Sequence, residues 1–293
     1  TSGNLRTSEA GPVPPPGEYS LGITATNPAG TSAVATFSVL AQGDVIEPPP
    51  PPPPPPPTGD FPNDTTTGYR GTLSAPEGGL TVSTNGAVIS GRSFTGEVRI
   101  EADNVTIRDC KVSCGGYYTI IGVDRSFTVE YCDIDGAING IAGSGVFRFN
   151  DISKIDNGVN LWGPTVVEGN WIHDFGARDS DAPHYDGIEI NGGGGHTIRN
   201  NNIVLQVDQT SALMINNYFG AVRDILVENN RLVGGGYTIY TDARFTETPI
   251  DNVRFIGNRL GRGRYGYTAY LETATNVTWS GNVDDVTGET VQS

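Results

Sequence analysis

The sequence predicts an all-β protein whose main part is a single-stranded right-handed parallel β-helix of about eight to nine coils. Two observations support this prediction. A short pattern repeats along most of the chain, and the composition is rich in glycine, with 40 of 293 residues, and in short runs of valine, isoleucine and threonine. We therefore expect three segments, which are a partial β module at 1–47, a linker at 48–60 and the β-helix at 61–293.

The first segment, 1–47, contains two alternating apolar runs. One begins at Tyr19 and the other at Ala33, and the turn sequence Asn27-Pro-Ala-Gly30 lies between them. This arrangement predicts a β-hairpin. The hairpin resembles the last strands of bacterial immunoglobulin-like modules, which implies a fragment of a domain that begins upstream, because a complete sandwich needs about 100 residues.

The linker contains an unbroken run of ten prolines, from Pro48 to Pro57. Such a run predicts a polyproline II rod about 31 Å long, at roughly 3.1 Å per residue. We interpret it as a spacer that holds two modules apart.

The third segment repeats a short pattern. It consists of an apolar residue, two residues of any type, Asn or Cys, one residue of any type, and a second apolar residue. The pattern occurs eight times, and its central residues are Cys110, Cys132, Asn150, Asn170, Asn201, Asn230, Asn258 and Asn282. Successive central residues lie 22, 18, 20, 31, 29, 28 and 24 positions apart. A steady core period with longer insertions is typical of a solenoid whose insertions loop out on one side.

The residue before each central Asn or Cys indicates a bend between two strands. Six of the eight residues at this position are Gly, Asn or Asp, which tolerate a left-handed backbone. We expect each following Asn to point inward and to bond to its counterparts in adjacent coils, because a buried amide without partners is costly. Cys110 and Cys132 take the same position in the first coils, so we expect buried, stacked thiols that no disulfide need join.

The repeats and the segment Asn104-Val-Thr-Ile-Arg-Asp resemble the pectate-lyase-like β-helix superfamily, over residues 61–283. That superfamily includes polysaccharide lyases, polygalacturonase-type glycosidases and phage tailspikes. The resemblance implies a polysaccharide or cell-surface glycan as partner, and a location outside the cell or on the surface of a virion. It also implies a homotrimer if the chain belongs to a fibre.

The net charge narrows the set of partners. The chain has 33 acidic and 18 basic residues, for a formal charge of −15. Nucleic acids and anionic membranes are bound through basic patches, so we expect no nucleic-acid partner. No apolar run approaches the length of a membrane span, so we expect no membrane insertion. The charge also weighs against a polyanionic glycan, unless a cation bridges the carboxylates.

A second strand precedes the ladder strand in five successive coils, and alternation along it places two columns of side chains outside. One column is Asn160, Glu189, Met214, Tyr240 and Tyr270, and the other is Trp162, Asn191, Asn216, Asp242 and Glu272. Aromatic rings pack on the apolar face of a sugar, and carboxylates and amides bind its hydroxyl groups. The predicted substrate-binding residues are therefore Trp162, Asn191, Asn216, Tyr240, Asp242, Tyr270 and Glu272.

The longest insertion, between Asn170 and Asn201, lies beside or contains all three histidines and several carboxylates. Its segment His184-Tyr-Asp186-Gly resembles the Asn-Thr-Asp-Gly motif of polygalacturonase-type glycosidases, and Asp208 follows 22 residues later, where that family has paired aspartates. The resemblance implies inverting hydrolysis by Asp186 and Asp208, with Glu189 and His184 as further catalytic candidates. The family's later Gly-His-Gly and Arg-Ile-Lys motifs are missing here.

Lyase chemistry is the second option for this insertion. A base would remove the proton next to a uronate carboxylate, which a cation or an arginine neutralises. Arg178 is the candidate base or clamp, and Asp179 and Asp181 with Asp186 are candidate ligands for Ca²⁺. We expect no required cofactor, with Ca²⁺ as an option. Two of the histidines offer a transition-metal alternative, although hydrogen-bonded loop residues are the simpler interpretation.

Two classes of function remain open at this point. The chain is either a polysaccharide hydrolase or lyase, or a non-catalytic module of a tail fibre or cell-surface adhesin. The carboxylates around Asp186 favour the enzyme. The missing motifs, the partial β module and the proline run favour the non-catalytic module.

Overall fold

The computed structural model describes residues 61–176 and 184–293 in full, and the backbone of four short strands between residues 17 and 41. The chain divides into two compact units, Thr1–Pro54 and Pro55–Ser293. In the first unit, β1 (Gly17–Ile23) pairs antiparallel with β4 (Ala35–Ala41), and β2 (Thr26–Asn27) pairs with β3 (Gly30–Thr31). This pairing agrees with the predicted hairpin, and the proline run lies outside the described residues.

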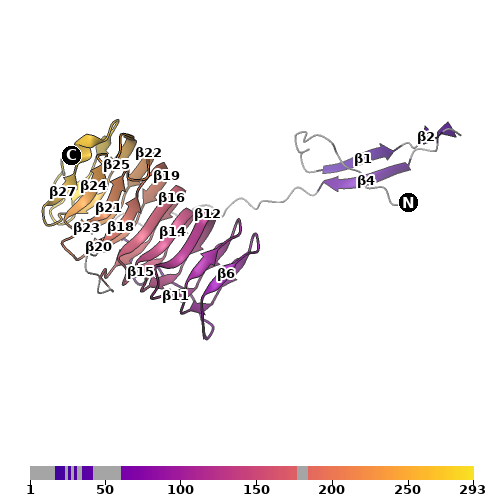
Figure 1. Cartoon of the computed structure of the whole chain (residues 1–293), viewed down its shortest axis with the longest axis horizontal. Coiled ribbons are helices and arrows are strands. Elements are labelled where there is room, and N and C mark those ends of the chain that lie inside the picture. Colours follow the sequence, from indigo (N-terminus) through magenta and orange to yellow (C-terminus); the bar gives the residue numbers. More distant parts are fainter. Residues whose placement is uncertain (1–16, 24–25, 28–29, 32–34, 42–60, 177–183) are drawn as a thin grey trace. The chain divides into compact units, whose positions relative to one another are not determined.

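The second unit is a parallel β-helix with three faces (Figure 1). The first face contains β6 (Leu80–Val82), β9 (Val98–Ile100), the first halves of β12 (Tyr118–Glu130), β14 (Asn139–Arg148) and β16 (Asn157–Glu168), then β18 (Asp186–Ile190), β21 (Ser211–Asn216), β24 (Tyr237–Asp242) and β27 (Gly266–Ala269). The second face contains β7 (Val88–Ser90), β10 (Thr106–Arg108), the second halves of β12, β14 and β16, then β19 (Gly193–Arg199), β22 (Val222–Glu228), β25 (Ile250–Ile256) and β28 (Thr278–Ser280).

The third face is a separate parallel sheet of shorter strands. It contains β5 (Pro76–Glu77), β8 (Ser93–Phe94), β11 (Lys111–Ser113), β13 (Asp133–Asp135), β15 (Asp151–Ser153), β17 (Trp171–His173), β20 (Asn202–Leu205), β23 (Arg231–Gly234), β26 (Arg259–Gly261) and β29 (Val283–Asp284). One short 3₁₀ helix, η1 (Leu271–Thr273), follows β27. The nine strands of the first face in the described residues agree with the predicted eight to nine coils.

The predicted bends are confirmed at all eight positions. The residue before each central Asn or Cys has a positive φ, between 50° and 66°. Tyr131 and Phe149 adopt this conformation too, although it is unfavourable for large side chains. Their rings stack with centroids 4.9 Å apart, and the guanidinium of Arg70 lies 3.4 Å above the ring centre of Tyr131. We infer that these contacts offset the backbone strain in the first coils.

The asparagine ladder is also confirmed, at the bend between the second and third faces. Each side-chain amide from Asn150 to Asn258 donates to the amide oxygen of the next rung at 2.9–3.0 Å. Each also donates to a backbone carbonyl in the preceding coil. Cys110 and Cys132 hold the first two rungs as buried free thiols, so no disulfide joins them. The ladder satisfies amides that would otherwise be costly to bury.

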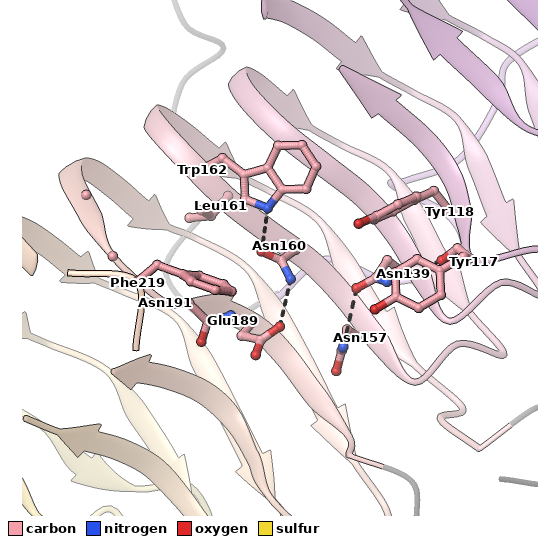
Figure 2. Close-up of a pocket in the computed structure, with 12 residues that line it drawn as sticks. Tyr117, Tyr118, Asn139, Asn157, Asn160, Leu161, Trp162, Glu189, Asn191 and Phe219 are labelled. Atoms are coloured by element: carbon pink, nitrogen blue, oxygen red, sulfur yellow. Dashed lines mark hydrogen bonds between the residues drawn. The ribbon is translucent and has the colours of Figure 1, made fainter. Parts of the chain in front are cut away.

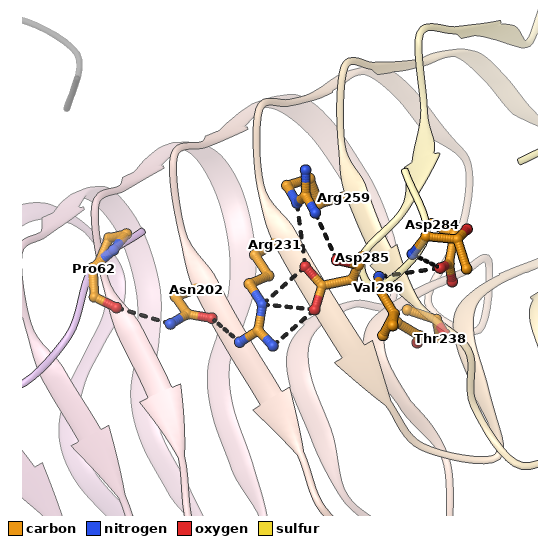
Figure 3. A network of polar contacts seen from close by, with 10 residues as sticks. Pro62, Asn202, Arg231, Thr238, Arg259, Asp284, Asp285 and Val286 are labelled. Carbon is orange, nitrogen blue, oxygen red and sulfur yellow. Dashed lines mark hydrogen bonds and ion pairs between the residues drawn. The ribbon is translucent and has the colours of Figure 1, made fainter. Parts of the chain in front are cut away.

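Two distant segments of the β-helix unit are tied to its third face (Figure 3). The Asn202 side chain donates to the backbone oxygen of Pro62 at 2.8 Å and accepts from Arg231 at 3.2 Å. Arg231 and Arg259 both bind the Asp285 carboxylate, with Arg231 Nη2 2.8 Å and Arg259 Nε 3.3 Å from its oxygens. The segment after the linker and the C-terminal segment are therefore both anchored on this face, which leaves the first face free of them.

Apart from the ladder and a few buried polar groups, the interior of the β-helix is apolar. The central coils contribute inward aliphatic or phenylalanine side chains with no solvent exposure, such as Ile107, Phe147 and Phe255. Stacked apolar columns of this kind supply most of the stability of a solenoid. Across the part of the chain that the structure describes, no helix has the length and apolar character needed to cross a membrane.

Candidate functional site

Two adjoining hollows on the first face form an elongated groove. One has a volume of about 600 Å³ and is lined by residues from β12, β14, β16 and β18. The other has a volume of about 370 Å³ and is lined by residues from β18, β21 and β24 and the loops beside them. Glu189, Asn191 and Phe219 line both hollows, so the two are continuous. The five spacings of ~4.8 Å between these six coils give the groove a length of about 24 Å.

The predicted outward columns are confirmed through four coils. Asn160 pairs with Glu189, Glu189 with Met214, and Met214 with Tyr240. In the second column, Asn216 pairs with Asp242. The strand alternation therefore brings Trp162, Asn191, Asn216, Tyr240 and Asp242 to the lining of the groove, as expected.

The predicted alignment of the last coil is wrong by one residue. Tyr240 pairs with Ala269 rather than with Tyr270, and β27 ends there. Tyr270 has a φ of 61° and turns the chain into η1, so that Leu271 is buried. The Tyr270 ring lies below the guanidinium of Arg244, 3.4 Å from its centre, and Glu272 lies in η1. Neither Tyr270 nor Glu272 lines the groove.

Two chains of hydrogen bonds converge on the Glu189 carboxylate. In the first (Figure 2), Trp162 Nε1 donates to Asn160 Oδ1 at 2.9 Å, and Asn160 Nδ2 donates to Glu189 Oε2 at 2.7 Å. In the second, Asn216 Nδ2 donates to Asn191 Oδ1 at 2.6 Å, and the Asn191 side chain bonds to Glu189. Burial raises the pKa of Glu189, and the bond from Asn191 opposes that rise. The carboxylate is thus fixed at the centre of the groove.

Asp186 provides a second carboxyl group at the same place. It begins β18, is 2% exposed, and lines the smaller hollow. Its Oδ1 accepts a hydrogen bond from Ser211 Oγ at 3.0 Å, and its backbone nitrogen donates to Asn157 Oδ1 at 3.3 Å. Burial raises its pKa well above the usual range, and the negative charge of Glu189 adds to the rise. Two carboxyl groups with raised and linked pKa values are a common arrangement for acid–base chemistry.

Asp208 is not part of this arrangement. Its side chain is 68% exposed and forms an ion pair with Arg264, with Nη1 and Oδ2 3.3 Å apart. It lines neither hollow. The second carboxyl group beside Asp186 is therefore Glu189, which follows it by three residues in the same strand, and not Asp208.

The three histidines occupy three different environments. His184 lines the smaller hollow. His173 lies on the third face, stacked on Trp171, where the carboxylates of Asp151 and Asp174 outweigh burial and raise its pKa. His196 is 1% exposed in the core, and burial lowers its pKa to about 4. The histidines are thus not assembled into one site.

The metal prediction concerns residues that are only partly described. Arg178, Asp179 and Asp181 lie outside the described residues. Among residues 61–176 and 184–293, no three His, Cys, Asp or Glu side chains are grouped as metal ligands would be.

Sequence reasoning missed the aromatic residues at the rim of the groove. Tyr117 and Tyr118 line the larger hollow, Tyr218 and Phe245 line the smaller one, and Phe219 lines both. The available signal was a pair of adjacent aromatic residues followed by glycine, in Tyr218-Phe219-Gly220, directly after a strand of the groove. Tyr117-Tyr118 is a similar pair at the start of β12.

Comparison with known proteins adds nothing to this geometry. No family model matches the chain, and neither a curated protein nor a solved structure matches it. The fold and the groove together define a parallel β-helix protein with a preorganised polar and aromatic groove.

Proposed function

We propose that this protein binds a polysaccharide along the groove of the first face and hydrolyses it at Glu189 and Asp186. The observation that carries the proposal is the convergence of aromatic and amide side chains on the fixed Glu189 carboxylate, while the desolvated Asp186 carboxyl group lines the same groove. Aromatic rings suit the apolar faces of sugar rings, and amides suit their hydroxyl groups. A groove about 24 Å long accommodates several sugar units.

The charges of the groove support a glycan without acidic groups. The described residues that line the two hollows include no lysine and no arginine. Arg244, which follows β24, is held by Asp242, with Nε and Nη2 2.8 and 2.7 Å from its oxygens. Among the described lining residues, a uronate or sulfate group would therefore meet carboxyl groups and no compensating lysine or arginine. We infer a neutral polysaccharide as the substrate.

The carboxyl pair suits hydrolysis with two distinct roles. Asp186 is almost fully desolvated and retains its proton more readily, so it is the candidate acid that donates a proton to the leaving glycosidic oxygen. Glu189 accepts hydrogen bonds that favour its ionised form, so it is the candidate base that takes a proton from the attacking water. Water adds to the anomeric carbon and gives one proton to Glu189, the glycosidic bond breaks, and its oxygen takes the proton of Asp186. Proton exchange with solvent then restores both carboxyl groups.

The asparagine ladder and the repeats support membership of the pectate-lyase-like β-helix superfamily. The secreted enzymes and phage tailspikes of that superfamily meet their polysaccharides outside the cell, so we propose an extracellular or virion-surface location. The hairpin strands support an immunoglobulin-like module in the first unit, as in a multi-module fibre. A homotrimer follows if the chain forms part of such a fibre.

A non-catalytic glycan-binding module is the second candidate. Asp186 is 2% exposed and Glu189 already accepts bonds from two amides, which favours binding over turnover. The adhesin or tail-fibre function needs only the groove and not the chemistry.

A depolymerisation assay separates the two candidates. The protein is incubated with soluble β-glucan, galactomannan, xylan, chitosan and polygalacturonate, and new reducing ends and unsaturated products are measured. Hydrolysis predicts reducing ends without unsaturation, and their loss in Glu189→Gln and Asp186→Asn. The matched control is Asp208→Asn, which alters an exposed acid outside the groove and should retain activity. Binding without turnover favours the non-catalytic module. Unsaturated products would show that the protein is a lyase and not a hydrolase.

A further inference from the structure

Three large aromatic side chains are exposed together on two loops beside the groove. Tyr218 is 59% exposed, Phe219 is 78% exposed and Phe245 is 53% exposed. The ring of Tyr218 lies edge-on to both phenylalanines, with centroids 4.8 Å from Phe219 and 5.8 Å from Phe245. We call these three residues the aromatic platform. Exposed aromatic residues that cluster in this way often mark a binding surface.

The platform is held in place by one buried side chain. Asn217 has no solvent exposure, and the two N–H groups of its amide are shared among the backbone oxygens of Ala243, Thr246 and Thr248, which lie 3.0, 3.0 and 2.6 Å from its nitrogen. Its oxygen accepts from the backbone nitrogen of Phe245 at 3.1 Å. Asn217 therefore joins the loop that follows β21 to the loop that follows β24. Rings that are already fixed lose little conformational freedom when a ligand binds.

The platform is continuous with the groove. Phe219 lines both hollows, and its backbone nitrogen donates to the backbone oxygen of Asn191 at 2.7 Å. Gly192 lies directly against it, because a Cβ at that position would lie 3.3 Å from the backbone carbonyl carbon of Phe219 and 3.4 Å from its Cβ. Figure 2 shows Phe219 beside Asn191 and Glu189, across the hollow from Tyr117 and Tyr118. A polysaccharide that occupies the groove at Glu189 would therefore also meet the platform.

We infer that the aromatic platform is a separate subsite, which stacks on a sugar ring of the polysaccharide at a position flanking the unit bound at Glu189. This inference rests on the proposed function. The apolar face of a pyranose ring packs on an aromatic ring, while its edge stays free for hydrogen bonds. The subsite extends recognition beyond the carboxyl pair, so it discriminates long from short oligosaccharides.

The test is a calorimetric titration with a long and a short oligosaccharide of the polysaccharide that binds best in the panel above. Phe219→Leu keeps an apolar side chain but removes the ring, and Phe219→Trp keeps a ring. We expect Phe219→Leu to bind the long oligosaccharide about tenfold more weakly and to lose clearly less affinity for the short one. Phe219→Trp should bind both like the original chain. The matched control is Tyr69→Leu, an aromatic residue that is 38% exposed outside the groove and should change neither affinity.

The outcomes distinguish the subsite from the groove itself. Unchanged affinity of Phe219→Leu for the long oligosaccharide overturns the subsite. If Trp162→Ala still weakens binding in that case, the proposed function stands without the platform. Absence of glycan binding by the original chain overturns both. If Phe219→Leu instead turns a dimer into a monomer in sedimentation and leaves glycan affinity unchanged, the platform binds a second copy of this chain and the inference is wrong.

Discussion

Replacement of Asn201 by leucine tests the ladder that sets the geometry of every coil. The Asn201 amide donates to the backbone oxygen of Val167 and to Asn230 Oδ1, both at 2.9 Å. Its own oxygen accepts from the backbone nitrogen and the side-chain nitrogen of Asn170, at 3.0 and 2.9 Å. Leucine has a similar size and none of these groups, so Asn201→Leu removes four hydrogen bonds without opening a large cavity.

The expected cost follows from the groups that are left without partners. The Asn170 side chain keeps its hydrogen bonds to the backbone oxygens of Phe147 and Glu168. Asn230 Oδ1 still accepts a hydrogen bond from the backbone nitrogen of residue 201. The backbone nitrogen of Asn170 and the Val167 oxygen lose their side-chain partner. A buried donor without an acceptor costs about 1–3 kcal/mol, so the free energy of unfolding should fall by about 3 kcal/mol.

Thermal unfolding followed by circular dichroism measures this effect. For a unit of this size, a loss of about 3 kcal/mol lowers the melting temperature by roughly 6–12 °C. The control is Asn85→Leu, since Asn85 is exposed and accepts one bond from the backbone nitrogen of Asp103. It should cost about 1 kcal/mol or less. An Asn201→Leu melting temperature equal to that of the original chain would refute the role of the ladder.

Two further predictions concern stability. Burial lowers the His196 pKa from 6.5 to about 4, so the unfolded chain gains a proton before the fold does. Stability should therefore fall by about 3 kcal/mol as the pH falls from 6.5 to 4, and urea unfolding of His196→Leu should lack that part of the pH dependence. Asp285→Ala should cost roughly 2 kcal/mol, because Arg231 and Arg259 lose their shared carboxylate. A urea midpoint that does not move would show that this tie contributes nothing.

The sequence predicted the repeating part of the fold because its signals are local. An inward Asn or Cys after a left-handed residue occupies two adjacent positions, and such a pair occurs eight times along the β-helix. The bends at Tyr131 and Phe149 fell outside the residue types expected there, since their support comes from ring stacking and from Arg70, 61 positions before Tyr131. A pattern read along the chain does not include contacts of that kind.

The candidate site was predicted only as far as strand alternation reaches. Trp162, Asn191 and Glu189 lie where alternation places them. Tyr270 does not, because the register of β27 already places Ala269 opposite Tyr240, and the left-handed Tyr270 then turns the chain into η1. Phe219 and Phe245 come from separate loops that Asn217 joins, so only the folded chain brings them together.

The choice of a second carboxyl group beside Asp186 also shows what sequence analysis alone does not reach. Resemblance to a glycosidase motif directed attention to Asp208, which the fold leaves exposed beside Arg264. Glu189 was the nearer choice in sequence, and the fold places it in the groove through the pairing of β18 with β16. Its importance rests on the amides that surround it, which come from three different strands or their ends.

The most direct test of the account is calorimetric binding of neutral and acidic polysaccharides to the original chain and to Trp162→Ala. Trp171→Ala serves as the control, because Trp171 lies on the third face against His173. The account predicts binding to at least one neutral polysaccharide, no binding to polygalacturonate, and an affinity about tenfold lower in Trp162→Ala alone. Absence of binding to every neutral polysaccharide, or equal affinity of the original chain and Trp162→Ala, would contradict a glycan-binding groove on the first face.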